Sequence, residues 1–323
     1  MPTVVPAEGP LLQRLVAATP QALYRGLSRK ALVTFDAAQA KTTWALHHQR
    51  RFALVEGDQV LAGAARYDLA GMLDQQPLRI CALGSVFGEP DPAGAADHAV
   101  ALVDQLLKDA TRDGADLALM FRMPETAGPR PLGFEVVPLF DAELTVAESS
   151  RHGAPMTLVR GGEDRDVAAI AAMGRARAAR FRFHLDRDVD LVRYTLTRTR
   201  LFAGLRSAGS AQLIFVIAEE GITAAAYVVI SVSAGTWTIE ECGDRDASGA
   251  RVGALLQALI AREPVESRPV IRGWLPPGFV PPQVTISSLE PAGQVLLARV
   301  LSARVPRLTL SSADVLYWRN DMF

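Results

Sequence analysis

The chain has 323 residues, of which 49% are hydrophobic, and its formal net charge is −1. At roughly 100–200 residues per domain, this length predicts two domains, each with a sizeable core. The 34 basic and 35 acidic residues nearly cancel, so the chain as a whole has no attraction for nucleic acid or for an anionic membrane. Small molecules and protein surfaces are therefore the expected partners.

Cysteine usage and apolar runs indicate the class of protein and its compartment. The two cysteines, Cys81 and Cys242, are too few for a disulfide framework or a four-thiolate metal site. The first ten residues lack the basic start and apolar core of a secretory signal. The longest apolar run, 222–232, is too short to span a bilayer. We therefore expect a cytoplasmic protein with no metal site and no membrane contact.

The first half predicts strands, then a loop and a helix, then further strands. Alternating or continuous apolar residues indicate the strands, and apolar residues at a spacing of three and four indicate the helix. The loop GEPDPAGAA before the helix is rich in Pro and Gly. In chain order, the expected elements are two strands over 51–69 with a turn at Gly57 and Asp58, a strand over 78–87, a helix over 96–112, a strand over 115–121 and strand material over 133–146.

The second half repeats this order, which is what a tandem duplication would leave. Gly94 and Gly249 hold the corresponding position between loop and helix. The sequence thus predicts two related α/β domains, 1–150 and 151–323, with a linker near 147–155. The repeated elements are a hairpin over 211–235, a strand over 236–242, the loop GDRDASGAR, a helix marked by Val252, Leu255, Leu256, Leu259 and Ile260, and a strand over 269–275.

This order of elements is not that of a dinucleotide-binding fold. The sequence has neither GxGxxG after a first parallel strand nor GxxxxGK[ST]. Gly94 and Ala96 in the first loop, SVF at 85–87 and LGF at 132–134 resemble the GNAT superfamily of acyl-CoA-dependent N-acyltransferases. The resemblance implies an α/β fold with a mixed sheet in each of two tandem GNAT-like domains.

The resemblance also implies a co-substrate and a place for it. In that superfamily one strand separates from its neighbour, and the loop and helix N-terminus that follow bind the CoA pyrophosphate. Amide N–H groups and the positive helix end favour an anion, and small residues let the backbone approach it. The resemblance thus implies acetyl-CoA as co-substrate and the amine of a small molecule or peptide as acceptor. The residues implied to bind acetyl-CoA are Ser85, Val86, Phe87, Gly94, Ala95 and Ala96.

Each loop also has a plainer interpretation, as a small-residue turn that packs a helix against a sheet. The superfamily pattern begins with Gln or Arg, where this chain has Asp91. The second loop keeps Gly249 but places Arg251 in the small-residue position. An arginine there could hold a phosphate, although its bulk disfavours the usual CoA cradle.

Amide formation from a thioester needs a base for the amine proton and an acid for the departing thiolate. The acid in GNAT enzymes is often a tyrosine shortly before LGF, where this chain has Pro129. Among tandem GNAT enzymes, those of the enhanced-intracellular-survival type use the terminal carboxylate as base, and the resemblance assigns this role to Phe323; their third domain has no counterpart here. The catalytic candidates are Phe323, Asp321, Glu240 and Glu241.

These candidates have structural alternatives as well. Adjacent strand residues point to opposite faces, so one of Glu240 and Glu241 could be solvated while the other pairs with an arginine such as Arg245. The aromatic C-terminal segment could be a docked last strand. A catalytically decayed GNAT pair, acting as a ligand-binding or regulatory module, is therefore the rival interpretation. A homodimer is compatible with the sequence.

The segment 175–200 is basic, which suggests nucleic-acid binding as a third and least favoured function. Asp186, Asp188 and Asp190 interrupt it, and together with His184 they alternate in a way that suggests a metal site. A plainer interpretation is an acidic first turn of a helix that starts near Val189, favoured by the helix dipole.

Overall fold

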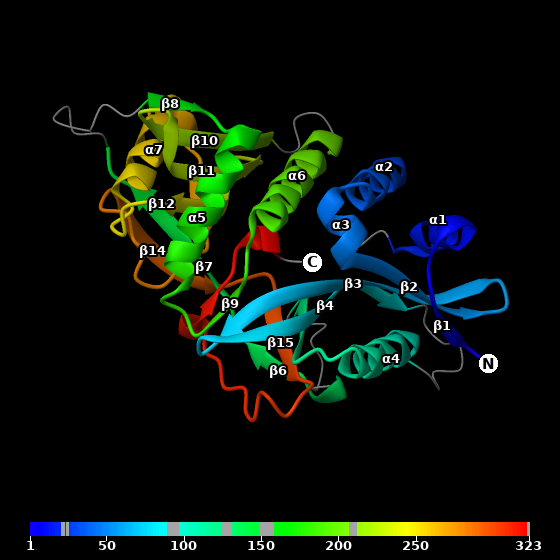
Figure 1. Ribbon diagram of the computed structural model, residues 1–323. Coiled ribbons are helices and arrows are strands. Elements are labelled where there is room, and N and C mark those ends of the chain that lie inside the picture. Colours follow the sequence, from blue (N-terminus) through cyan, green and yellow to red (C-terminus); the bar gives the residue numbers. More distant parts are fainter. Residues whose placement is uncertain are drawn as a thin grey trace. The chain divides into compact units, whose positions relative to one another are not determined.

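The computed structural model describes residues 1–20, 23, 26–88, 97–123, 131–148, 158–206 and 212–321 (Figure 1). The chain forms two compact units. Unit 1 contains residues 1–139 and 293–311, and unit 2 contains residues 140–292 and 312–321. Both units therefore take segments from distant parts of the chain.

Unit 1 is built on a mixed sheet with the strand order β1-β2-β3-β4-β5-β15-β6. Neighbouring strands are antiparallel except β4 and β5, which are parallel. The helices and strands are β1 (Thr3–Pro6), α1 (Gly9–Ala18), α2 (Arg29–Ala40), α3 (Thr43–His48), β2 (Gln49–Glu56), β3 (Gln59–Leu73), β4 (Gln76–Gly88), α4 (His98–Arg112), β5 (Leu117–Arg122), β6 (Glu135–Val137) and β15 (Val295–Val300).

Helix α4 is the crossover between the two parallel strands, and its sequence accounts for its limits. The side chain of Asp97 caps the first turn by accepting the N–H of Val100 at 3.0 Å. Gly114, with a φ of 82°, follows the last turn. The predicted helix over 96–112 is confirmed within two residues at its start.

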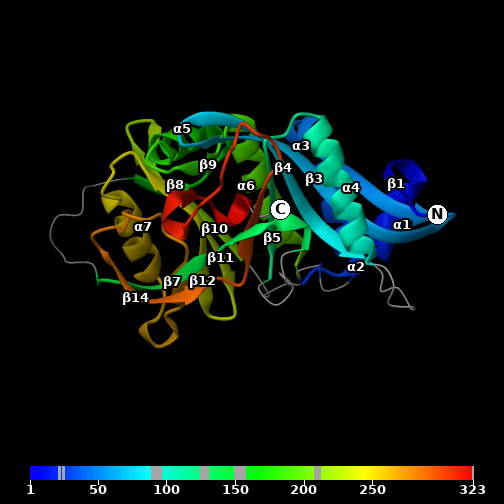
Figure 2. The same ribbon diagram turned by 90° about the horizontal axis from the view of Figure 1, so that it is seen from below.

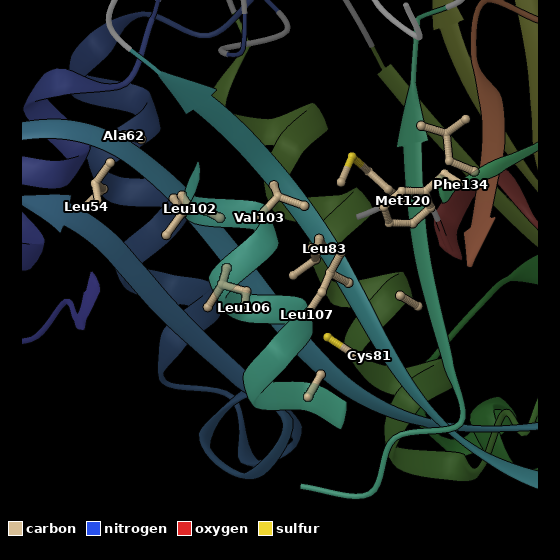
Figure 3. Packing of buried hydrophobic residues seen from close by; sticks show 14 of the residues in the cluster. Leu54, Ala62, Cys81, Leu83, Leu102, Val103, Leu106, Leu107, Met120 and Phe134 are labelled. Atoms are coloured by element: carbon tan, nitrogen blue, oxygen red, sulfur yellow. The ribbon is translucent and has the colours of Figure 1, made fainter. Parts of the chain in front are cut away.

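Helix α4 lies against the sheet of unit 1 (Figure 2). Its apolar side forms the core there with residues of the sheet (Figure 3). Leu102 and Leu106 are fully buried, and burying such a side chain contributes about 1.5–3 kcal/mol. The other face of the sheet is covered near α1, where Leu15 packs with Phe87. The residues of the α4 cluster labelled in Figure 3 are Leu54, Ala62, Cys81, Leu83, Leu102, Val103, Leu106, Leu107, Met120 and Phe134.

Unit 2 is built on a seven-stranded mixed sheet with the order β14-β7-β13-β12-β11-β10-β8. Here β12 and β13 are the parallel pair, and α7 connects them. The helices and strands are β7 (Phe140–Val146), β8 (Leu158–Gly161), α5 (Val167–Ala178), β9 (Phe183–Leu185), α6 (Val189–Leu205), β10 (Gln212–Glu220), β11 (Thr223–Ser233), β12 (Thr236–Asp244), α7 (Ala250–Ile260), β13 (Val270–Gly273), β14 (Val284–Pro291) and β16 (Val315–Leu316).

The two sheets have equivalent strand orders when one of them is read in reverse. In each sheet, one strand comes from the other half of the chain. The strand beside β5 is β15, which comes from residues 295–300. The strand beside β13 is β7, which comes from residues 140–146. The sequence predicts 133–146 as strand material of the first half; the structure instead divides this stretch, with β6 in one sheet and β7 in the other.

The acidic stretch before α6 is an ordinary helix start. Asp188 caps α6 by accepting the N–H of Leu191 at 2.7 Å, and Asp190 pairs with Arg193. The predicted helix start near Val189 is confirmed. Within the residues described, no cluster of three or more His, Cys, Asp or Glu side chains could hold a metal ion. In the same residues, no helix is both long enough and apolar enough to cross a membrane.

Candidate functional site

The two parallel strands of unit 1 pair over only part of their lengths. Parallel pairs join Ile80–Leu83 of β4 to Leu117–Met120 of β5. Beyond these residues, β4 pairs with β3 and β5 pairs with β15. Among the strands that the structure describes, none pairs with the β5-facing edge of β4 over residues 84–88. An open strand edge offers N–H and C=O groups to the amides of an extended ligand.

A bulge lies in this open segment of β4. Ser85 has a left-handed φ of 52°, and the pairing with β3 shifts register between Gly63 and Ala65. A bulge redirects backbone groups, and bulges are common beside active sites. Ser85 itself is exposed, and the side chain of Val86 packs partly against the α4 cluster. The open edge therefore carries a local distortion at two of the residues predicted to bind acetyl-CoA.

Phe87, the third residue of this predicted set on β4, has its side chain in the core. Its ring packs with Leu15, and a Cβ atom at Gly63 would lie 2.5 Å from the ring atom Cε1. Gly63 is thus required by the close approach of this ring. Only the backbone of Phe87 is available to a ligand.

The end of β4 meets the start of α4. A Cβ atom at Gly88, the last residue of β4, would lie 2.7 Å from the backbone N of Ala99. The absent side chain brings β4 close to the first turn of α4, a helix end that attracts anions. The loop residues Gly94, Ala95 and Ala96 lie outside the described residues.

The parallel strands of unit 2 also separate. Pairs join Thr236–Ile239 of β12 to Val270–Gly273 of β13. From Glu240 to Asp244, none of the strands in the described ranges pairs with that edge of β12. Opposite β11, the register shifts so that Ile239 and Glu241 face consecutive residues. Glu240 is therefore the extra residue of a bulge. Both glutamates predicted as catalytic candidates lie just past the point where the strands part.

Glu241 belongs to a buried cluster that is centred on Arg187. The guanidinium donates from Nη1 and Nη2 to both carboxylate oxygens of Glu241, each at 2.8 Å, and from Nη2 to Thr195 Oγ1 at 3.3 Å. Tyr227 donates its hydroxyl to Glu241 Oε1 at 2.6 Å. The arginine partner is Arg187, rather than the suggested Arg245.

Asp321 is the second carboxylate of this Arg187 cluster. Its Oδ1 lies 3.0 Å from Arg187 Nε as an ion pair without hydrogen-bond geometry. Its Oδ2 accepts the N–H of Trp318 at 3.0 Å. One cation thus faces two buried carboxylates: Glu241 is 0% exposed and Asp321 is 2% exposed.

The burial of this cluster sets its protonation. Burial raises the pKa of Asp321 from 3.8 to about 6, with repulsion from Glu241 adding to the effect and attraction to Arg187 opposing it. Burial also raises the pKa of Tyr227 well above its ordinary value. Burial alone would lower the pKa of Arg187, but the two carboxylates raise it. At neutral pH the tyrosine is therefore a hydrogen-bond donor, and the arginine is charged.

Glu240 has a separate environment beside Arg319. Its Oε2 lies 3.9 Å from Arg319 Nε, whereas Arg319 Nη1 donates to Asp141 Oδ2 at 2.6 Å. The side chain of Glu240 is 17% exposed. The remaining catalytic candidate, Phe323, lies outside the described residues.

Sequence reasoning missed two residues that define the environment of Glu241. Arg187 lies between two aspartates before a helix, and nothing in the sequence links it to Glu241. Tyr227 offers a weak signal, because a tyrosine inside a long apolar run is buried and needs a hydrogen-bond partner. Asp244, which the sequence offers together with Glu240 and Glu241, accepts the N–H of Arg251 at 2.8 Å.

Comparisons with known proteins were made for sequence and for structure. No protein-family model and no curated protein matches the sequence. A probable N-acyltransferase from Enterococcus faecalis V583 aligns with a TM-score of 0.63 over 93% of this chain and 73% of that chain, at 13% identity.

Further solved structures agree with this likeness. GCN5-related N-acetyltransferases from Anabaena variabilis and Kribbella flavida each align with a TM-score of 0.65 over 94% of this chain, at 11% and 16% identity. The alignments cover 74% and 72% of those chains. Eis1 from Mycobacterium abscessus aligns with a TM-score of 0.52 over 79% of this chain and 64% of its own, at 16% identity. The chain therefore has a mixed α/β fold of two GNAT-like domains, similar in fold to the GCN5-related N-acetyltransferases.

Proposed function

We propose that the protein transfers an acyl group from acetyl-CoA to the amine of a small molecule or peptide, and that unit 1 binds the acetyl-CoA. The observation that carries this proposal is the divergence of β4 and β5 after Leu83 and Met120. It leaves a bulged strand edge that ends at the start of an anion-attracting helix. The fold shared with N-acetyltransferases supports the same chemistry.

The reaction needs few groups from the protein. The unprotonated amine attacks the thioester carbonyl, a base accepts the amine proton, and the CoA thiolate leaves and is protonated. In our proposal, backbone N–H groups beside Ser85 stabilise the negative oxygen that develops on the carbonyl. Gly94, Ala95 and Ala96 are proposed to contact the pyrophosphate.

The contacts in unit 2 bear on the choice of base. Glu241 and Asp321 share Arg187 and are buried, which favours a role in anchoring the chain over direct contact with an amine. Glu240 keeps part of its side chain exposed, and its role as the base stays a proposal together with that of Phe323.

Calorimetric titration with acetyl-CoA tests the proposal. We expect saturable binding that Gly88→Val weakens at least tenfold, because a side chain at this position collides with the backbone of Ala99. Gly161→Val is the matched control, since a Cβ atom there would meet no atom within 4 Å. Wild-type protein that does not bind acetyl-CoA at millimolar concentration would overturn the proposal.

The alternative is a catalytically decayed GNAT pair that acts as a ligand-binding or regulatory module. The observation that favours it is the pairing of two of the candidate carboxylates, Glu241 and Asp321, with one buried arginine. Release of free thiol from acetyl-CoA, measured against a panel of amines, separates the two functions. Binding without thiol release would support the module.

A further inference from the structure

The two units place a helix N-terminus at the same point of the fold. In unit 1, β4 leads through a loop into α4 and then into β5; in unit 2, β12 leads into α7 and then into β13. Each crossover joins parallel neighbours, so the first turns of α4 and α7 occupy corresponding positions.

The residue at the end of the strand differs between the units. Gly88 is the last residue of β4, and its missing Cβ faces the backbone N of Ala99, the second residue of α4. Asp244 is the last residue of β12, and its Oδ2 accepts the N–H of Arg251, the second residue of α7. Where unit 1 has only a hydrogen atom, unit 2 has a carboxylate.

The carboxylate of Asp244 is fully buried and receives the donors that a bound phosphate would use. Its Oδ1 accepts the N–H of Asp246 at 2.8 Å and lies 3.1 Å from Arg251 Nη1. Gly249, which precedes α7 with a φ of 73°, packs against the ring of Phe279, 2.5 Å from the position of a Cβ atom. One arginine side chain and two backbone amides thus bind an anion that the chain itself supplies.

The gap between the strands of unit 2 is filled as well. Where β13 ends at Gly273, Arg319 reaches both Glu240 on β12 and Asp141 on β7. The rings of Tyr317 and Trp318 lie 4.4 and 5.4 Å from that of Trp274, directly after β13. Residues 317–321 therefore occupy the space that opens as β12 and β13 separate.

From these contacts we infer that unit 2 is a self-occupied copy of the ligand-binding fold. The Asp244 carboxylate takes the place of a ligand phosphate at α7, and residues 317–321 take the place of an extended ligand between β12 and β13. The inference rests on the proposed function in one respect, since it takes the β4–α4 region as the acyl-CoA site. Its consequence is that one chain binds at most one acetyl-CoA.

Removing the internal anion tests the inference with inorganic pyrophosphate as the probe. Asp244→Ala frees the N–H groups of Asp246 and Arg251 and the Nη1 of Arg251, while Glu220 keeps its contact with Nη2. We therefore expect pyrophosphate at a hundredfold excess over its Kd to raise the Tm of this variant by about 5 °C or more. Asp246→Ala is the matched control, because it also removes one negative charge, two residues from Asp244, but leaves the Asp244 carboxylate bound at the start of α7. Pyrophosphate should shift the Tm of the wild type and of this control less.

Equal shifts in the two variants would overturn the inference. A second measurement does not depend on a variant that folds: native mass spectrometry counts acetyl-CoA molecules on the wild-type chain. One molecule or none agrees with a closed unit 2, and two overturn it. The Gly88→Val variant distinguishes a failure of the proposed function from a failure of this inference, because it changes acetyl-CoA binding in unit 1 alone.

Discussion

Replacing Asp321 with asparagine separates the charge of this side chain from its shape. The Arg187 cluster holds two carboxylates against one cation, so the ionised form of Asp321 leaves an excess negative charge in the interior. A pKa raised from 3.8 to about 6 corresponds to about 3 kcal/mol. Because the folded pKa is the higher one, this contribution to stability is fully present below pH 3.8 and is lost as the pH rises to about 6.

Asp321→Asn should therefore be at least as stable as the wild type at pH 7.5, and its stability should lack this loss between pH 4 and pH 6. Urea unfolding at several pH values, followed by tryptophan fluorescence, measures the difference. The signal reports mainly on unit 2, which holds Trp237, Trp274 and Trp318. A variant that is more than about 1 kcal/mol less stable than the wild type at pH 7.5, with the same pH dependence, would refute this reasoning.

Arg187→Met should have the opposite effect on stability, because it changes the cation of the same cluster. It leaves Glu241 and Asp321 buried without their cation, and breaking a buried pair in this way costs about 3–5 kcal/mol. The loss should shrink as the pH falls, because protonation of Asp321, whose pKa burial raises, removes an unpaired charge. The same urea titration measures it, and equal losses at pH 5 and pH 7.5 would contradict the electrostatic explanation.

Three further predictions concern the packing and the termini of the units. Gly63→Val should destabilise the protein by about 1–3 kcal/mol, measured by thermal unfolding, because the new side chain overlaps the ring of Phe87. The thiols of Cys81 and Cys242 are buried and their pKa is raised to about 12, so a disulfide reagent at pH 8 should modify them only after denaturation; rapid modification of native protein would contradict this. A fragment 1–150 lacks β15 and should show no cooperative unfolding transition by circular dichroism, whereas a sharp transition would show that its sheet is stable without that strand.

Local patterns in the sequence were sufficient for the elements around the site. The spacing of apolar residues predicts α4, and the loop composition places its start, because both depend on neighbours within one or two turns. The strand over 78–87 is confirmed in β4, Gln76–Gly88. The divergence of β4 from β5 was expected only through the resemblance, since residue types along one strand do not say where pairing with another strand stops.

Long-range partners were not predictable in this way. No element was predicted over 295–300, where β15 lies. The segment that forms β7 was predicted as strand material, but a hydrophobic strand pattern fits either sheet equally well. The same holds for Glu241, whose sequence neighbours suggested Arg245, whereas its partner, Arg187, lies before α6. Charge pairing in the core depends on topology, which a single sequence specifies only through the whole fold.

The exchanged strands offer a physical reason why a self-occupied unit 2 is retained. β15 lies between β5 and β6 of unit 1, so the sheet that carries the proposed acetyl-CoA site is completed by chain that follows residues 140–292 of unit 2. Unit 2 in turn depends on β7, which directly follows residues 1–139 of unit 1. Loss of a ligand groove in unit 2 leaves this mutual dependence intact, because the groove lies on the β12 side of β13 whereas β7 pairs with its opposite edge. A carboxylate at the end of β12, as in Asp244, can therefore close the groove of unit 2 while the sheet of unit 1 keeps its central strands.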